Sequence, residues 1–180
     1  MESDDLVQYR SRYWRAPFVL VVLRIFLAFV LLIAISLEYL EISIVAYALA
    51  FITDVLDGRI AKWMKITTSS AIEAYLDPVA DFIFVLLSFY AFSLKSIYSP
   101  LLLVQFIIMF VFFIITSNDS KPLYDPIGKY YGIYLFITIG LTIVFQETLV
   151  FNFVLVSVIF YSIILVLYRS IFLWKKRKEN

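Results

Sequence analysis

Residues 53–62 read TDVLDGRIAK, and they place Asp54 and Asp57 near the end of an apolar run of membrane-spanning length. A carboxylate at the middle of a membrane helix costs about 2.5–3.5 kcal/mol on insertion scales. Aspartates in such a run therefore indicate a functional site.

A second acidic pair, Asp77 and Asp81, lies in residues 76–81, LDPVAD, close to the start of the next apolar run. Pro78 is expected in or near the first turn of that helix, where its missing N–H would have no partner anyway. Residues three or four apart lie on one face of a helix, so each pair points in one direction. A short loop joins the two runs and keeps both pairs within about 15 Å of one membrane surface. Four carboxylates are thus expected to converge.

The composition of the whole chain is that of a membrane protein. Of 180 residues, 63% are hydrophobic and 16% are charged, and the mean hydropathy is +0.95, whereas a soluble domain is about 45–50% apolar. Only helices and closed barrels satisfy their backbone in lipid, and the apolar runs do not alternate. We predict one all-α, polytopic membrane domain, residues 1–180. Its six transmembrane helices are expected at about 16–37, 39–60, 75–94, 97–116, 128–146 and 149–173.

The distribution of charge predicts the orientation, because short loops rich in lysine and arginine stay on the cytosolic side. Such residues precede the first segment and follow the second, fourth and sixth, whereas the other loops receive mainly glutamates. Both termini and the acidic site are therefore expected on the cytosolic face of the cytoplasmic membrane. Residues 1–15 are expected to form a juxtamembrane, amphipathic segment in the headgroup layer, with a disordered basic tail as the alternative. Residues 174–180 are expected to form a basic tail.

The chain contains no histidine and no cysteine. An all-oxygen cluster selects hard ions, namely magnesium, manganese or calcium, and magnesium is the expected one. Magnesium sites combine one or two carboxylates with phosphate oxygens and water, so the pattern predicts a phosphate-bearing substrate. Gly58 would let a ligand approach the backbone or would serve helix packing. Arg59 and Lys62 would contact phosphate or extend to the headgroups.

These residues resemble the signature of the CDP-alcohol phosphotransferase family, Asp-x2-Asp-Gly-x2-Ala-Arg-x8-Gly-x3-Asp-x3-Asp. The positions matched are Asp54, Asp57, Gly58, Ala61, Asp77 and Asp81. Lys62 replaces the motif arginine, which keeps the charge but loses its bidentate geometry. Glu73 stands at the second glycine position, and the loop between the two halves is two residues longer than usual.

Two further likenesses lie outside this signature. Pro17 and Arg24 match the ends of the family's opening Pro-Asn-x-x-Thr-x-x-Arg, and Gly128-Lys129 is similar to a segment that opens the fifth helix of phosphatidylglycerophosphate synthases. With six spans and both termini inside, the resemblance covers nearly the whole chain.

The resemblance implies an enzyme that transfers a phosphatidyl-type group from a CDP-linked lipid to the hydroxyl of a small polar alcohol and releases CMP. It implies two Mg²⁺ ions, with Mn²⁺ as a substitute, and a homodimer in the lipid bilayer; no nucleic acid is expected as a partner. Asp54, Asp57 and Asp77 would hold the metals, and Asp81 would act chiefly as the base and share a metal. The CDP-lipid would be bound by Asp54, Gly58, Ala61 and Lys62.

The acceptor is expected to be glycerol 3-phosphate, because the Gly-Lys likeness points to it, with inositol phosphate as the alternative. Its phosphate would need cationic partners, for which Arg24, Lys121 and Lys129 are the candidates. Two other classes stay open. Intramembrane aspartates also occur in cation or proton transporters, and Glu73 with the longer loop is compatible with an inactive scaffold.

Overall fold

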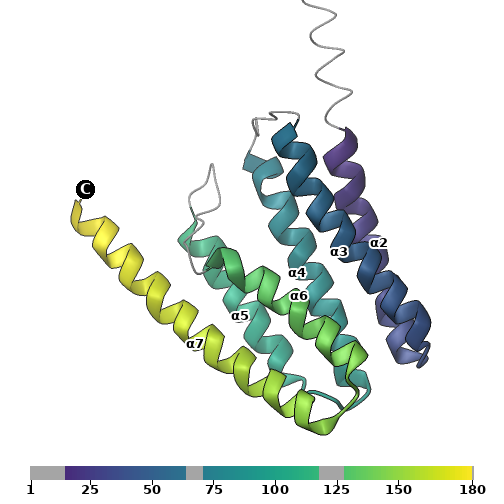
Figure 1. Ribbon diagram of the computed structural model, residues 1–180. Helices are drawn as coiled ribbons and strands as arrows, with labels where there is room; N and C mark the ends of the chain where they lie inside the picture. The colour runs from purple at the N-terminus through teal and green to yellow at the C-terminus, as the bar shows by residue number, and fades with distance from the viewer. Residues whose placement is uncertain (1–14, 64–70, 118–127, 180) are drawn as a thin grey trace, which may run out of the picture.

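The computed structural model describes the backbone of residues 15–63, 71–117 and 128–179, and the side chains of residues 18–56, 75–117 and 130–174. This part of the chain contains no strand, which confirms the predicted all-α class. It forms the helices α2 (Arg15–Ser36), α3 (Leu40–Trp63), α4 (Ala71–Leu94), α5 (Leu101–Thr116), α6 (Gly128–Val144) and α7 (Thr148–Glu179) (Figure 1). The expected amphipathic segment before residue 15 lies outside the described residues.

Each predicted segment overlaps one of these helices, but α4 begins earlier than expected, α5 begins later, and α7 continues to Glu179 through most of the expected basic tail. Among the described residues, three helical stretches are long and apolar enough to cross a bilayer, namely Phe18–Ser36, Tyr75–Leu94 and Thr148–Trp174. Two more, Leu101–Thr116 and Tyr130–Val144, are apolar but shorter. The structure thus supports a membrane protein and leaves the number of spans as a prediction.

The expected position of Pro78 is wrong. Helix α4 begins at Ala71, so Pro78 stands inside the helix, two turns from its start. A proline there removes one backbone hydrogen bond, and in the interior of a soluble helix it costs about 3 kcal/mol or more. Membrane helices tolerate proline better, because neighbouring helices and local adjustments satisfy the freed groups.

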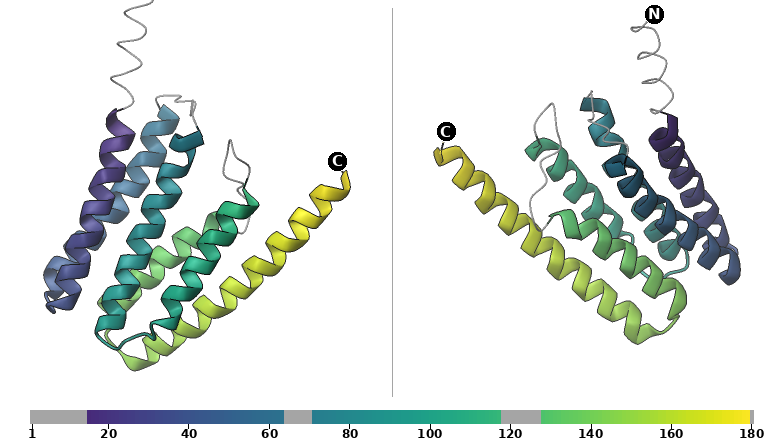
Figure 2. Two further views of the ribbon diagram at one scale, coloured as in Figure 1. Left: turned by 180° about the vertical axis from the view of Figure 1, so that it is seen from behind. Right: turned by 45° about the horizontal axis from the view of Figure 1, so that its top comes forward.

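Helix α2 is the centre of the half of the molecule that carries the aspartates. It packs along both α3 and α4, whereas α3 and α4 make no close backbone contact with each other within the described residues. Helix α6 packs against α3, α4 and α7, and α5 touches α7 at few points. Figures 1 and 2 show α7 leaning away from the other helices toward its C-terminal end.

The core of the bundle is aromatic. The Phe89 ring contacts Phe92, Tyr98 and Phe106 with centroid distances of 5.7, 5.4 and 4.8 Å, and Phe84 stacks on Phe136 at 4.8 Å. Many large apolar side chains are exposed on the outside of the helices. An apolar surface around a packed core is what a lipid-embedded bundle requires.

Helix α6 carries a glycine, Gly140, where the Tyr47 side chain of α3 packs against it. The Tyr47 hydroxyl on α3 donates a hydrogen bond to the Phe136 carbonyl on α6 at 3.0 Å. A Cβ atom built on Gly140 would lie 2.6 Å from the Tyr47 hydroxyl oxygen, whereas one on Gly132 of the same helix would meet nothing within 4 Å. Gly140 therefore makes room for the tyrosine.

Helices α2 and α4 end in the same way, with a non-glycine residue in the left-handed region. Glu38 has φ 64° and Ser96 has φ 57°. The backbone N–H groups of Tyr39 and Ile97 donate to carbonyls five residues earlier, which defines a Schellman motif at each end. Lys95 donates to Glu38 at 2.7 Å and joins the two turns. That hydrogen bond, together with the charge of Lys95, lowers the pKa of Glu38, so the pair is intact at neutral pH and is lost only as the pH falls through the lowered pKa.

We expect Ser96→Gly to stabilise the protein. A side chain in the left-handed region costs about 1–2 kcal/mol, and the greater chain entropy of glycine offsets part of the gain, which leaves roughly 0.5–1 kcal/mol. This corresponds to a rise of about 1–4 °C in the Tm measured in detergent. The matched control is Ser93→Gly, inside α4, where glycine should lower the Tm. Equal shifts in both variants would contradict this account of the turn.

Candidate active site

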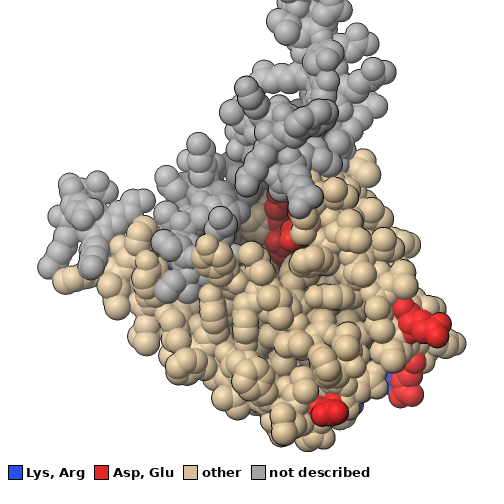
Figure 3. Space-filling view, viewed as in Figure 1, with Lys and Arg blue, Asp and Glu red and all other residues tan. Residues whose placement is uncertain are grey.

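Three helices contribute charged side chains to one half of the bundle, the half in which α2 and α4 begin and α3 ends. Helix α2 supplies Arg24, α3 supplies Asp54, and α4 supplies Asp77 and Asp81. Figure 3 shows acidic atoms in a hollow of this half of the described surface, next to residues that the structure does not describe. Other acidic side chains lie at the opposite end.

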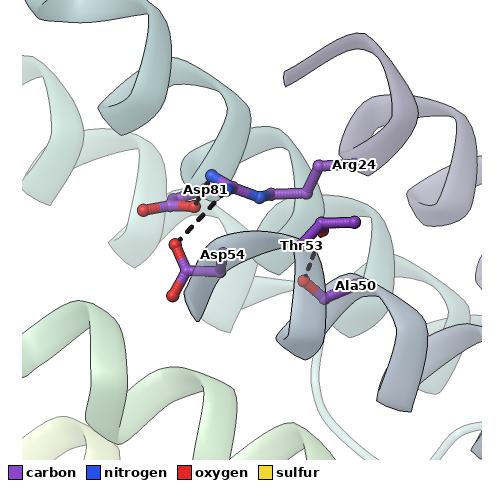
Figure 4. A network of polar contacts seen from close by, with 5 residues as sticks. All are labelled: Arg24, Ala50, Thr53, Asp54 and Asp81. Carbon is purple, nitrogen blue, oxygen red and sulfur yellow. Dashed lines mark hydrogen bonds and ion pairs between the residues drawn. The ribbon is translucent and has the colours of Figure 1, made fainter. Parts of the chain in front are cut away.

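Arg24 joins two of these aspartates (Figure 4). Its Nη1 atom donates a hydrogen bond to Asp81 Oδ1 at 2.7 Å, and its Nη2 atom lies 3.4 Å from Asp54 Oδ1. The guanidinium comes from α2, between the two helices that carry the carboxylates. The structure therefore brings one aspartate of each predicted pair to a common point.

The cluster is buried on one side and open on the other. Arg24 has no exposed surface, whereas the side chains of Asp54 and Asp81 are 36% and 34% exposed. Asp77 is exposed and lies within electrostatic range of Arg24 and Asp54. The carboxylates are partly open and have a buried cation behind them. They form an acidic surface that a cation or a cationic complex can reach.

Small residues and a local hydrogen bond position the aspartates. Ala50 on α3 and Ala80 on α4 are fully buried, which permits close packing of the helices against their neighbours. The Thr53 hydroxyl donates to the Ala50 carbonyl at 2.7 Å and so keeps its own polar group satisfied beside Asp54 (Figure 4).

Other predicted site residues lie outside the described side chains. Asp57, Gly58, Ala61 and Lys62 belong to the last turns of α3. Glu73 belongs to the first turn of α4, and Lys129 to the first turn of α6. Lys121 lies outside the described residues altogether. Their roles stay predictions.

The donor chemistry fits a hard divalent cation. The cluster offers carboxylate oxygens, which Mg²⁺ and Mn²⁺ prefer. Within the described ranges, no three acidic side chains are close enough together to hold an ion. One oxygen of Asp54 and one of Asp81 face Arg24, and the second oxygen of each makes no hydrogen bond or ion pair with the described residues. Asp57, the fourth aspartate of the motif, has a side chain outside this description.

A cavity of about 500 Å³ lies at the opposite end of the bundle, between the turns that follow α2, α4 and α6. It is lined by apolar residues and by Glu38, Ser43, Lys95, Thr142 and Gln146. None of the predicted site residues belongs to it, so the cavity is separate from the acidic cluster.

A second buried arginine was not singled out from the sequence. Arg169 on α7 is 2% exposed. It donates to the Thr116 hydroxyl at 2.5 Å and to the Phe113 carbonyl at 3.2 Å, and its guanidinium lies 5.0 Å from the centre of the Phe113 ring. Arg169 thereby joins α7 to the end of α5. An arginine in an apolar run is the signal that would have found it.

Three long apolar helices indicate a membrane protein, and one aspartate of α3 and one of α4 meet at Arg24. A family model described as CDP-alcohol phosphatidyltransferase matches residues 14–174, and the chain belongs to this family. No curated protein and no solved structure gives a significant match. The protein is thus an enzyme of phospholipid biosynthesis, a transferase that moves a phosphatidyl group from a CDP-alcohol to an acceptor. The family generally depends on a divalent metal ion.

Proposed function

We propose that the protein is a multi-pass phospholipid synthase of the cytoplasmic membrane that transfers a phosphatidyl-type group from a CDP-linked lipid to glycerol 3-phosphate and releases CMP. The observation that carries the proposal is the Arg24–Asp54–Asp81 cluster near the middle of α2, α3 and α4. Besides the family match, this cluster brings together one aspartate from each half of the family motif.

The proposed topology has six spans and both termini in the cytosol, in one domain over residues 1–180. The positive charge of the loops at the end of the bundle that carries the cluster supports this orientation. The apolar outer surface supports a bilayer around the helices. The homodimer that the family resemblance implies belongs to the proposal as well.

Asp54, Asp57 and Asp77 would hold two Mg²⁺ ions, with Asp81 sharing one and Mn²⁺ as a substitute. When bound, the ions would neutralise the diphosphate of the donor and the charge that develops on the departing CMP. Asp54, Gly58, Ala61 and Lys62 would bind the CDP part of the donor.

Asp81 would take the proton of the acceptor hydroxyl. Arg24 holds one of its oxygens, and the second faces away from that contact. As the acceptor oxygen forms its bond to the phosphorus that carries the lipid, the proton passes to Asp81 and the bond from that phosphorus to the CMP oxygen breaks. A carboxylate base suits a chain without histidine.

Lys121 and Lys129 are the proposed partners of the acceptor phosphate. Arg24 was predicted as a third, but its guanidinium is fully buried and engaged by two aspartates. A phosphate would have to replace a carboxylate to reach it. Glycerol 3-phosphate is the proposed acceptor on the likeness of the Gly128-Lys129 segment, with inositol phosphate second.

The test is CMP release by the purified full chain in liposomes with CDP-diacylglycerol or a CDP-linked ether lipid, Mg²⁺ and a panel of alcohols. We expect glycerol 3-phosphate to stimulate release and EDTA to abolish it. Stimulation by uncharged inositol or serine alone would reject the two lysines as phosphate contacts. Absence of release with every donor and acceptor would reject the transferase and favour the transporter or the inactive scaffold, which ion-flux measurements would separate.

A further inference from the structure

Arg24 contacts two aspartates that have different proposed tasks. Asp54 is a metal ligand in the proposed function, and Asp81 is the base. We propose that Arg24 is a positioning residue that divides the aspartates between these tasks: it holds Asp81 in place for proton transfer and leaves Asp54 for the metals. This inference rests on the proposed function.

The contacts of the guanidinium with Asp81 and with Asp54 are unequal. The contact with Asp81 is a hydrogen bond of 2.7 Å, which is the short distance typical of a charge-assisted bond. The contact with Asp54 is longer, at 3.4 Å. An incoming divalent cation would therefore displace Asp54 from Arg24 more easily than Asp81.

The position of Arg24 is fixed by burial and by packing. Its side chain has no exposed surface, so water cannot replace either carboxylate. Helix α2 packs along both α3 and α4, which have no close backbone contact with each other in the described part of the chain. The guanidinium is thus the polar link between the helix that carries Asp54 and the helix that carries Asp81.

The charge of Arg24 acts on the metals as well as on the base. Four aspartates at one site repel each other, and the guanidinium neutralises one of them. A fixed cation beside the ligands also weakens the binding of further cations. Arg24 therefore lowers the affinity for the metals. An enzyme tolerates this loss when the arginine also keeps the base free for proton transfer.

The experiment measures Mn²⁺ binding by titration calorimetry without substrate, and kcat for CMP release, on the purified full chain. In Arg24→Gln we expect the Mn²⁺ affinity to rise roughly threefold or more, because a nearby positive charge is lost. We expect kcat to fall about 100-fold, because Asp81 is no longer held in place for proton transfer. In Arg24→Lys the Mn²⁺ affinity should stay within about twofold of the wild type, and kcat should still fall, because the ammonium keeps the charge without the guanidinium fork.

Two further variants separate positioning from general damage. Arg169→Gln removes the other buried arginine and should not raise the Mn²⁺ affinity. In an Asp81→Asn background, Arg24→Gln should lower kcat little further, because groups that act through each other are not additive. If Arg24→Gln does not fold, the same measurements are made on Arg24→Lys, alone and combined with Asp81→Asn.

The inference is overturned if Mn²⁺ affinity and kcat fall together in Arg24→Gln, if kcat is unchanged, or if the losses in the double variant add up. A wild type that binds Mn²⁺ but releases no CMP would refute the proposed function separately. The inference on Arg24 would then fail if Arg24→Gln did not bind Mn²⁺ more tightly. A wild type that binds no Mn²⁺ would overturn both.

Discussion

Asp81→Asn is expected to lower kcat for CMP release by about 10²–10⁴-fold, the usual contribution of a general base. The amide keeps the size of the carboxylate but cannot accept the proton of the acceptor hydroxyl. Because Asp54, Asp57 and Asp77 would still hold the metals, the Mn²⁺ affinity should fall much less than in a variant of one of these three residues. Turnover and titration calorimetry on the same preparation measure both quantities.

Two comparisons make this prediction specific to the base. Ser88→Ala changes a buried residue two turns further along α4, whose hydroxyl donates to the Phe84 carbonyl, and it should leave kcat unchanged. Asp57→Asn should weaken Mn²⁺ binding and turnover together. If Asp81→Asn weakens Mn²⁺ binding as much as Asp57→Asn does, Asp81 is chiefly a metal ligand and the base must be sought elsewhere.

Gly140→Ala is expected to destabilise the protein by about 1–3 kcal/mol, the usual cost of inserting a methyl group into a filled space. The new Cβ would lie 2.6 Å from the Tyr47 hydroxyl oxygen and 2.8 Å from the ring carbon that bears it. The tyrosine would have to move and would lose its hydrogen bond to the Phe136 carbonyl. Unfolding in detergent followed by circular dichroism measures the change.

Gly132→Ala is the matched control, because it lies in the same helix with nothing near its Cβ position. There the higher helix propensity of alanine should stabilise by up to about 1 kcal/mol. Tyr47→Ala should relieve most of the further cost of Gly140→Ala, since it removes the group that clashes. Equal effects of the two glycine substitutions would show that the contact between α3 and α6 does not limit stability.

The positions of the helices could be predicted because they depend on local hydrophobicity. The start of α4 could not be predicted, because residues 71–74 are only weakly apolar. They extend the helix beyond the length that a membrane span needs, through their helix propensity. This error also misplaced Pro78. Convergence of Asp54 and Asp81 followed from their spacing and from the short loop between their helices.

The sequence indicates Arg24 as a candidate site residue, but the partners of its side chain could not be predicted. Its contacts depend on how α2 is rotated about its own axis, and that rotation is set by simultaneous packing against α3 and α4. The depth of the arginine was the available signal, since a buried cation in an apolar helix requires an anion at the same level. Lys62 and Glu73, the departures from the family signature, have side chains outside the described part and remain the least constrained residues of the site.

The link between Arg24 and the aspartates also has a consequence for biosynthesis. Helix α2 is synthesised first, and Asp81 follows 57 residues after Arg24. At about 5–20 residues per second, the arginine waits roughly 3–11 s for this partner. Until Asp54, its earlier partner, has also been made, α2 carries an uncompensated charge, for which insertion scales give about 2.5–3.5 kcal/mol at the centre of a helix. Loss of the aspartates would therefore leave the charge of Arg24 uncompensated in α2 from its insertion onward, before the stability of the finished protein matters.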